Sequence, residues 1–101
     1  MKISIFGLGY VGCVSLGCLA KSGNDVIGID ISEEKVNLIN QGIPTIIEDK
    51  IDYLIKDGYE KGRISAVLDY QFAVNNSDVS FICVGTPSTQ SRSEDNTSEL
   101  Q

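Results

Sequence analysis

Short apolar runs alternate along this chain with stretches in which apolar residues recur every three or four positions. Apolar runs of strand length occupy residues 2–6, 26–29, 64–67 and 78–84. The stretches with helical spacing lie between them, at residues 11–19, 32–42, 52–61 and 70–76. Strands that alternate with helices in this order predict an α/β fold with a parallel sheet.

The turn after the first strand carries the strongest chemical signal. Residues 7–12 are Gly-Leu-Gly-Tyr-Val-Gly and lead directly into the first helix. Gly7 allows a sharp turn, Gly9 lets the backbone approach a pyrophosphate, and Gly12 lets the helix pack close to the sheet. The free N–H groups and the positive dipole end of the helix point at the same place, which suits a doubly negative pyrophosphate.

Asp30 ends the second strand, 23 residues after Gly7. In dinucleotide-binding folds an acid roughly 20 residues after the glycine turn hydrogen-bonds the adenine ribose hydroxyls. Because a carboxylate would repel the 2′-phosphate of NADP, the sequence predicts NAD as the cofactor. The alternative is a glycine-tight turn that binds nothing, with Asp30 as a strand-end carboxylate that caps the next helix.

The remaining pattern predicts where the helices begin and end. Ser32 is a candidate N-cap of the second helix, and Gly42 is a candidate left-handed stop. Residues 45–48 are expected to be extended, and the third helix is expected at residues 52–61. Asp69 is expected to cap the fourth helix. Helical spacing in the first helix is carried by Val11, Val14, Cys18 and Leu19.

Two further side chains could reach the same cofactor. Lys35 lies five residues after Asp30, and Thr86 follows the strand at residues 78–84. The carboxyl ends of parallel strands meet at one edge of the sheet, so Thr86 would arrive beside Gly9 and Asp30. On the residues alone, an exposed helix lysine explains Lys35 better, and Gly-Thr-Pro also makes a simple turn around Thr86.

The length and composition describe one small globular domain. The 101 residues are 42% hydrophobic and 22% charged, which is ordinary for a chain with a small core. Residues 89–101 contain one apolar residue and no periodicity. We therefore expect a domain of residues 1–88 followed by a polar, disordered tail of residues 89–101.

Charge and hydropathy exclude several partners. Eight Lys plus Arg residues stand against 14 Asp plus Glu, a net charge of −6, which is a poor match to nucleic acid. No apolar span approaches the ~20 residues of a membrane helix, so no membrane partner is expected. The N-terminus has no signal-peptide features. These observations predict a cytoplasmic protein.

The three cysteines show no metal-binding pattern. Cys13, Cys18 and Cys83 have neither metal-ligand spacing nor a Cys-x-x-Cys pair, so no metal site is predicted. Cys13 and Cys18 are five apart on one helix and should face different directions. We expect these cysteines to be small buried hydrophobes in a reducing compartment.

The segments that carry these signals resemble a known family. They are Lys35 and residues 6–12, 26–30, 38–42 and 77–87. Together they resemble the N-terminal domain of the UDP-glucose/GDP-mannose dehydrogenases, over about residues 1–88. The amino-acid sequences of these segments are most similar to those of the GDP-mannose members. The resemblance implies a Rossmann-like doubly wound parallel sheet, truncated here to its N-terminal part.

The resemblance also implies an activity for the full-length parent. Such an enzyme oxidises the 6-hydroxyl of a sugar nucleotide to a carboxylate in a four-electron reaction that reduces two NAD. The reaction passes through a cysteine-bound thiohemiacetal and thioester. For a GDP-mannose parent the product is GDP-mannuronate, used in polysaccharide biosynthesis; a UDP-glucose parent is the alternative. A homo-oligomer is implied for the parent.

The resemblance assigns roles to five residues of this chain. Tyr10 and Val11 lie against the pyrophosphate through their backbone amides, and Asp30 takes the adenine ribose. Lys35 lies near that ribose, and Thr86 contacts the cofactor from the end of a third strand. These implied roles favour cofactor contacts for Lys35 and Thr86 over the simpler alternatives.

The chain departs from the family pattern in two ways. Asp49-Lys50-Ile51 follows Glu48 where the family usually has Pro-Gly-Leu. The nucleophilic cysteine and the sugar-nucleotide domain come later in the family than any residue here, so no catalytic residue is predicted and this chain alone is expected to be inactive. A stand-alone NAD-binding module and a non-functional truncation product remain alternatives. Half a doubly wound sheet is expected to be marginally stable or to self-associate.

Overall fold

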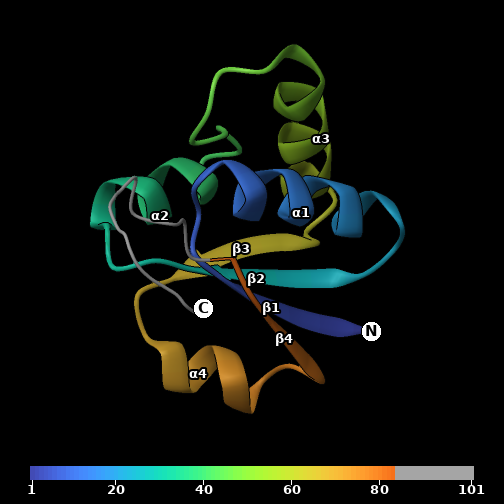
Figure 1. The fold of residues 1–101 in the computed structure, drawn as a ribbon. Coiled ribbons are helices and arrows are strands. Elements are labelled where there is room, and N and C mark those ends of the chain that lie inside the picture. Colours follow the sequence, from blue (N-terminus) through green and yellow to red (C-terminus); the bar gives the residue numbers. More distant parts are fainter. Residues whose placement is uncertain (84–101) are drawn as a thin grey trace, which may run out of the picture.

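In the part of the chain that the structure describes, a four-stranded parallel sheet forms the centre (Figure 1). The computed structural model describes residues 1–83. The strand order is β3-β2-β1-β4, and every neighbouring pair is parallel. In this described part the elements are β1 (Lys2–Phe6), α1 (Tyr10–Lys21), β2 (Asp25–Ile29), α2 (Glu33–Ile39), α3 (Asp49–Glu60), β3 (Ile64–Val67), α4 (Tyr70–Asn75) and β4 (Val79–Ile82).

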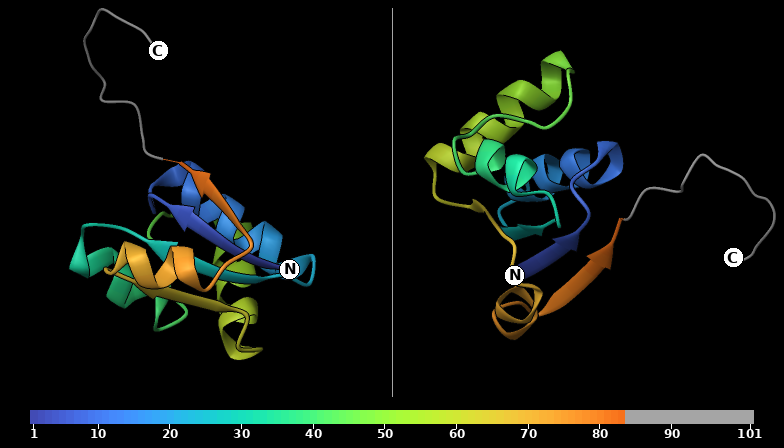
Figure 2. Two further views of the ribbon diagram at one scale, coloured as in Figure 1. Left: turned by 90° about the horizontal axis from the view of Figure 1, so that it is seen from below. Right: turned by 90° about the vertical axis from the view of Figure 1, so that its left-hand side faces the viewer.

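Helices lie on both faces of this sheet. α1, α2 and α3 lie on one face, above the strands in Figure 1, and α4 lies on the other (Figures 1 and 2). β1, β2 and β3 advance across the sheet in one direction, and the chain then returns through α4 to place β4 beside β1. This is the N-terminal part of a Rossmann-like doubly wound sheet, as predicted. In such sheets ligands bind at the carboxyl ends of the strands, where the winding reverses.

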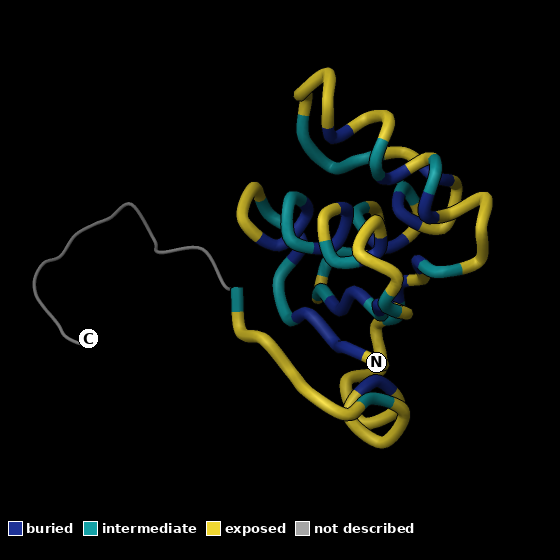
Figure 3. Tube along the Cα trace, turned by 90° about the vertical axis from the view of Figure 1, so that its right-hand side faces the viewer, coloured by how far each residue is buried: buried dark blue, intermediate teal, exposed yellow. Residues whose placement is uncertain are grey.

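The core lies between the sheet and the helices α1 and α3. Ile5 of β1, Leu16 of α1 and Ile55 of α3 are fully buried. α1 and α3 approach closely because Gly17 faces α3: a Cβ at this position would lie 3.0 Å from the Leu54 Cβ. Figure 3 shows the buried positions gathered in this interior, while β4 is exposed along its length.

The residues that α1 buries are not the four that carry its helical spacing in the sequence. Val11 and Cys18 are exposed, and Val14 and Leu19 are only partly buried. Val14 and Leu19 still pack against the core, but the spacing omitted Leu16, which is fully buried, and the small residues that let a helix pack closely. The side chains and backbone that α1 buries belong to Gly12, Cys13, Leu16, Gly17 and Ala20.

The three cysteines are free and lie in different environments. Cys13 is buried, as predicted, but Cys18 is exposed and Cys83 is partly buried. The expectation that all are buried hydrophobes is therefore wrong for Cys18, which lies on the side of α1 turned away from the core. Cys83 packs against the core immediately after β4, which ends at Ile82.

The connector between α2 and α3 is more bent than predicted, and α3 begins earlier. Thr45 lies in a bend rather than an extended segment, and the first residue of α3 is Asp49 rather than Asp52. Glu48 has the extended backbone of an N-cap, so Asp49-Lys50-Ile51 can form the first helical turn. Asp49 and Asp52 place acids in that turn, which the helix dipole favours.

The predicted caps of the other helices are confirmed. The Ser32 side chain accepts a hydrogen bond from the Lys35 backbone N–H, and Asp69 accepts from the N–H groups of Gln71 and Phe72. Gly42 has φ +77°, the left-handed conformation expected after α2.

The outer edge of β3 is covered by a side chain from the end of α2. The Asn40 amide nitrogen donates to the Ala66 carbonyl at 2.9 Å, and the Ala66 N–H donates to the Asn40 amide oxygen at 2.9 Å. Both backbone groups of Ala66 are therefore paired on the side away from β2. This arrangement protects an edge that could otherwise pair with another chain.

Candidate functional site

The turn from β1 to α1 requires glycine at Gly7 and Gly12, whereas Gly9 leaves space that a side chain would fill. Gly7 has φ +102°, and its N–H donates to the Ile29 carbonyl at 2.8 Å. A Cβ at Gly12 would lie 1.7 Å from the Gly7 carbonyl oxygen, so the first turn of α1 can pack there only without a side chain. A Cβ at Gly9 would meet nothing within 4 Å. Gly9 therefore leaves open space beside the backbone.

Asp30 connects the tips of β1 and β2. Its Oδ2 accepts from the Leu8 N–H at 2.8 Å, and its Oδ1 accepts from the Ser32 N–H at 2.8 Å. The bond from Ser32, the N-cap residue of α2, agrees in part with the alternative in which Asp30 caps the next helix. The carboxylate can still accept further hydrogen bonds, because each of its oxygens has two lone pairs.

The charge of Asp30 is stabilised by these neighbours. Partial burial raises the pKa of the Asp30 carboxyl, but the hydrogen bonds from Leu8 and Ser32 and the positive charge of Lys35 lower it. The net effect places the pKa below the ordinary value of 3.8. Asp30 is therefore a carboxylate at neutral pH and can accept hydrogen bonds from hydroxyl groups.

A groove of about 480 Å³ lies at the carboxyl ends of β1, β2 and β3. Exposed apolar side chains form one part of it: Ile31 is 101% exposed, Leu68 50% and Tyr70 59%. Asp30 and the glycine turn form the other part. The groove is lined by Phe6, Gly7, Gly9, Ile29, Asp30, Ile31, Lys35, Leu68 and Tyr70.

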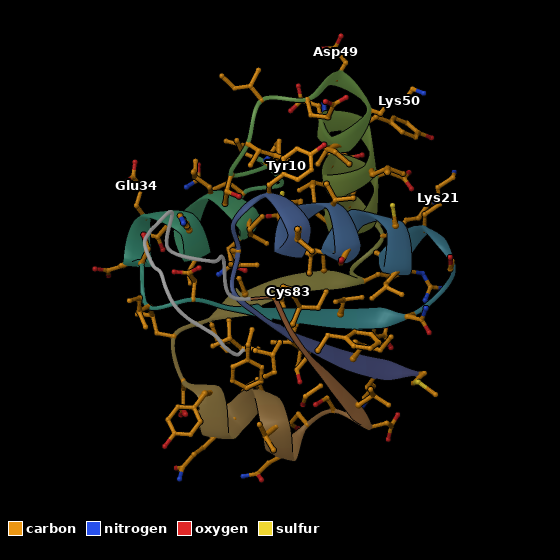
Figure 4. All side chains as sticks on the ribbon, in the orientation of Figure 1. Tyr10, Lys21, Glu34, Asp49, Lys50 and Cys83 are labelled. Carbon is orange, nitrogen blue, oxygen red and sulfur yellow. The ribbon has the colours of Figure 1, made fainter. Side chains whose placement is uncertain are left out.

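Four of the eight predicted site residues line this groove, namely Gly7, Gly9, Asp30 and Lys35. Tyr10 and Val11 form the first turn of α1, with exposed side chains, and Figure 4 labels Tyr10 at this end of the helix. Gly12 is buried beneath that turn. Thr86 lies outside the described residues. The cofactor contacts of all eight residues remain predictions.

The sequence prediction missed the five apolar residues of the groove, of which Phe6 and Ile29 end strands β1 and β2. Ile31, Leu68 and Tyr70 follow the carboxyl ends of β2 and β3. The positions of all five at or after the ends of predicted strands were the available signal, because parallel strands bring their carboxyl ends together. Exposed apolar groups beside a carboxylate suit a planar base attached to a ribose.

The electrostatics of the turn favour an anion. Helix α1 has no acidic residue in its first turn, so no side-chain carboxylate there offsets the positive end of its dipole. The open space at Gly9 adjoins this helix end, and Asp30 stands at the tip of the neighbouring strand. A glycine turn at a helix N-terminus, an acid at the tip of the neighbouring strand and an apolar groove are together typical of a dinucleotide-binding domain of the Rossmann type.

Comparison with known proteins identifies the family. Residues 1–100 match the model of the UDP-glucose/GDP-mannose dehydrogenase family, NAD binding domain. The chain belongs to this family, and NAD is the cofactor of this domain.

Several relatives are similar over most of this chain. The GDP-mannose 6-dehydrogenase of Pseudomonas aeruginosa is 56% identical over 88 residues, which cover 87% of this chain and 20% of that protein. The UDP-glucose 6-dehydrogenase of Rhizobium meliloti is 43% identical over 88 residues, 87% of this chain and 20% of that protein. A crystal structure of a ternary complex of the Pseudomonas aeruginosa GDP-mannose dehydrogenase has a TM-score of 0.85 and 55% identity, covering 88% of this chain and 20% of that one.

The chain spans about a fifth of the length of these relatives. Among residues 1–83, no helix is both long and apolar enough to cross a membrane. The same residues contain no group of three or more His, Cys, Asp or Glu side chains placed to hold a metal ion.

Proposed function

We propose that this chain is the NAD-binding part of a sugar-nucleotide 6-dehydrogenase that oxidises GDP-mannose to GDP-mannuronate. The observation that carries the proposal is the pairing of the open Gly9 turn with the Asp30 carboxylate at one groove. The choice of GDP-mannose is supported by the higher identity to the Pseudomonas aeruginosa relative, 56% against 43% for the Rhizobium meliloti relative.

In this proposal the eight predicted site residues contact different parts of the cofactor. The glycine turn and the backbone N–H groups of Tyr10 and Val11 hold the pyrophosphate. Asp30 accepts hydrogen bonds from the adenine ribose, and Lys35 lines the same groove. Thr86 reaches the cofactor from the segment that follows β4. The apolar residues of the groove give the adenine a surface on which to lie.

The chain of 101 residues is proposed to bind NAD without catalysing the reaction. The catalytic residues, the sugar-nucleotide site and the homo-oligomer belong to the full-length parent. The proposed domain covers residues 1–88, with residues 89–101 as a polar tail. We propose a cytoplasmic location, with neither nucleic acid nor a membrane as a partner, in keeping with the net charge of −6.

Calorimetric titration of the purified chain with NAD and, separately, with NADP tests this proposal. Saturable binding that favours NAD is expected, because the Asp30 carboxylate faces the ribose position and would repel a 2′-phosphate. Absence of binding by either dinucleotide would restrict the function to longer relatives. Equal affinity for the two would contradict the role of Asp30.

A further inference from the structure

The Leu8 residue of the glycine turn is held on three sides. Its side chain is fully buried, and a Cβ at Gly28 of β2 would lie 2.7 Å from the Leu8 Cδ2. Its N–H donates to the Asp30 carboxylate at 2.8 Å. Its carbonyl accepts from the Thr45 hydroxyl at 2.7 Å. The third contact comes from the connector between α2 and α3, 37 residues away along the chain.

This third contact determines how the next peptide group is oriented. The C=O of Leu8 and the N–H of Gly9 belong to one planar trans peptide, so they point in opposite directions. Because Thr45 fixes the carbonyl on one side, the Gly9 N–H is fixed on the other. Gly9 lines the groove and has open space around its Cα. A peptide whose orientation is already fixed beside the groove needs no further ordering when an anion binds there.

The connector can hold Thr45 in place because it is anchored on both sides of that residue. Before Thr45, the Ile43 N–H donates to the Leu38 carbonyl at 2.9 Å, and Gly42 packs against the Tyr59 ring. After it, Ile46 packs against the hydrophobic core. The Thr45 hydroxyl therefore acts from a fixed position rather than from a free loop.

We propose that Thr45 is a positioning residue for the phosphate-binding turn, acting through the Leu8–Gly9 peptide on NAD affinity. This inference rests on the proposed binding of NAD at the turn. Thr45 does not line the groove, so its effect on NAD passes through the backbone of the turn.

The test compares Thr45→Val, which removes the hydroxyl at nearly constant shape, with Thr45→Ser, which retains it. In the full chain, Thr45→Val is expected to weaken NAD binding by about 3- to 10-fold, the range of one lost hydrogen bond, and Thr45→Ser to restore it. Ile46→Val is the matched control, because it lowers stability in the same connector without touching the hydroxyl. All affinities are measured by calorimetry well below the melting temperature of each variant.

A second measurement separates this inference from the proposed function. The backbone ¹⁵N shift of Gly9 without ligand reports the hydrogen bond at the Leu8 carbonyl, since that carbonyl and the Gly9 nitrogen share one peptide. The shift is expected to move in Thr45→Val and to stay near the wild-type value in Thr45→Ser and Ile46→Val. Unchanged NAD affinity in Thr45→Val, or an unchanged Gly9 shift, would overturn the positioning role. If the wild-type chain binds no NAD, the proposed function fails, and the Gly9 shift still decides whether Thr45 orients the peptide.

Discussion

The Asp30 carboxylate accepts one backbone hydrogen bond on each oxygen, from Leu8 after β1 and from Ser32 before α2. These bonds hold the carboxylate at the carboxyl end of β2 and hold the glycine turn against it. At the residue scale, the group proposed to bind ribose also organises the turn proposed to bind pyrophosphate. Substitutions of Asp30 should therefore change both NAD affinity and stability.

Replacing Asp30 with alanine is expected to weaken NAD binding by about 1–3 kcal/mol, because a charged hydrogen-bond acceptor is lost. Calorimetry on the variant and the wild-type chain measures the difference. Glu34→Ala is the matched control, since it removes an equal charge from an exposed position in the first turn of α2. Equal affinity of Asp30→Ala and wild type would rule out a ribose contact for Asp30.

Asp30 should also make stability depend on pH in the acid range. Its pKa in the native chain is lower than the ordinary value of 3.8, so below that pH the unfolded chain binds the proton more readily than the native chain. The stabilisation is therefore complete above the ordinary pKa and is lost as pH falls through the lowered one. Urea unfolding of wild type and Asp30→Asn should show stability curves that converge on acidification. Parallel curves would mean that Asp30 contributes no pH dependence.

At the scale of elements, the turn between β1 and α1 was largely predictable from the sequence, whereas the residues that α1 buries were predictable only in part. Gly7 and Gly12 have the structural roles that their spacing indicated. α1 also buries Gly17 and Ala20, small residues that carry little hydropathy signal, and their burial follows from the position of α3. The Thr45 bond to Leu8 was also unpredictable, because it joins segments that meet only in the folded chain.

Two alanine substitutions in this turn should affect different properties, stability in one case and NAD affinity in the other. Gly12→Ala places a Cβ 1.7 Å from the Gly7 carbonyl oxygen, so the free energy of unfolding is expected to fall by about 3 kcal/mol or more. Gly9→Ala meets no atom within 4 Å and should leave stability nearly unchanged. Its Cβ occupies the space proposed for the pyrophosphate, so NAD affinity should fall by about 10-fold or more.

Urea unfolding and calorimetry on the two variants distinguish these effects. Normal NAD binding by a stable Gly9→Ala chain would place the pyrophosphate elsewhere. A stable Gly12→Ala chain would show that the first turn of α1 can shift away from Gly7.

At the scale of the whole molecule, the two outer strands of the described sheet differ in how well they are covered. The free edge of β3 is paired in part with the Asn40 side chain. In β4, Val79, Phe81 and Ile82 are 36, 44 and 68% exposed. Exposed apolar residues on an edge strand favour pairing with a second chain. The net charge of −6 opposes such contacts, and salt screens that repulsion.

The chain is accordingly expected to self-associate through β4, more strongly as protein and salt concentrations rise. Sedimentation velocity over a range of both concentrations measures this association. Phe81→Lys should reduce it, because a lysine on an edge strand disfavours pairing with another strand. Ile47→Lys is the matched control, since it removes a fully exposed apolar side chain from the connector, away from the sheet edge. A wild-type chain that stays monomeric throughout and melts sharply at high temperature would show that β4 is stable without a partner.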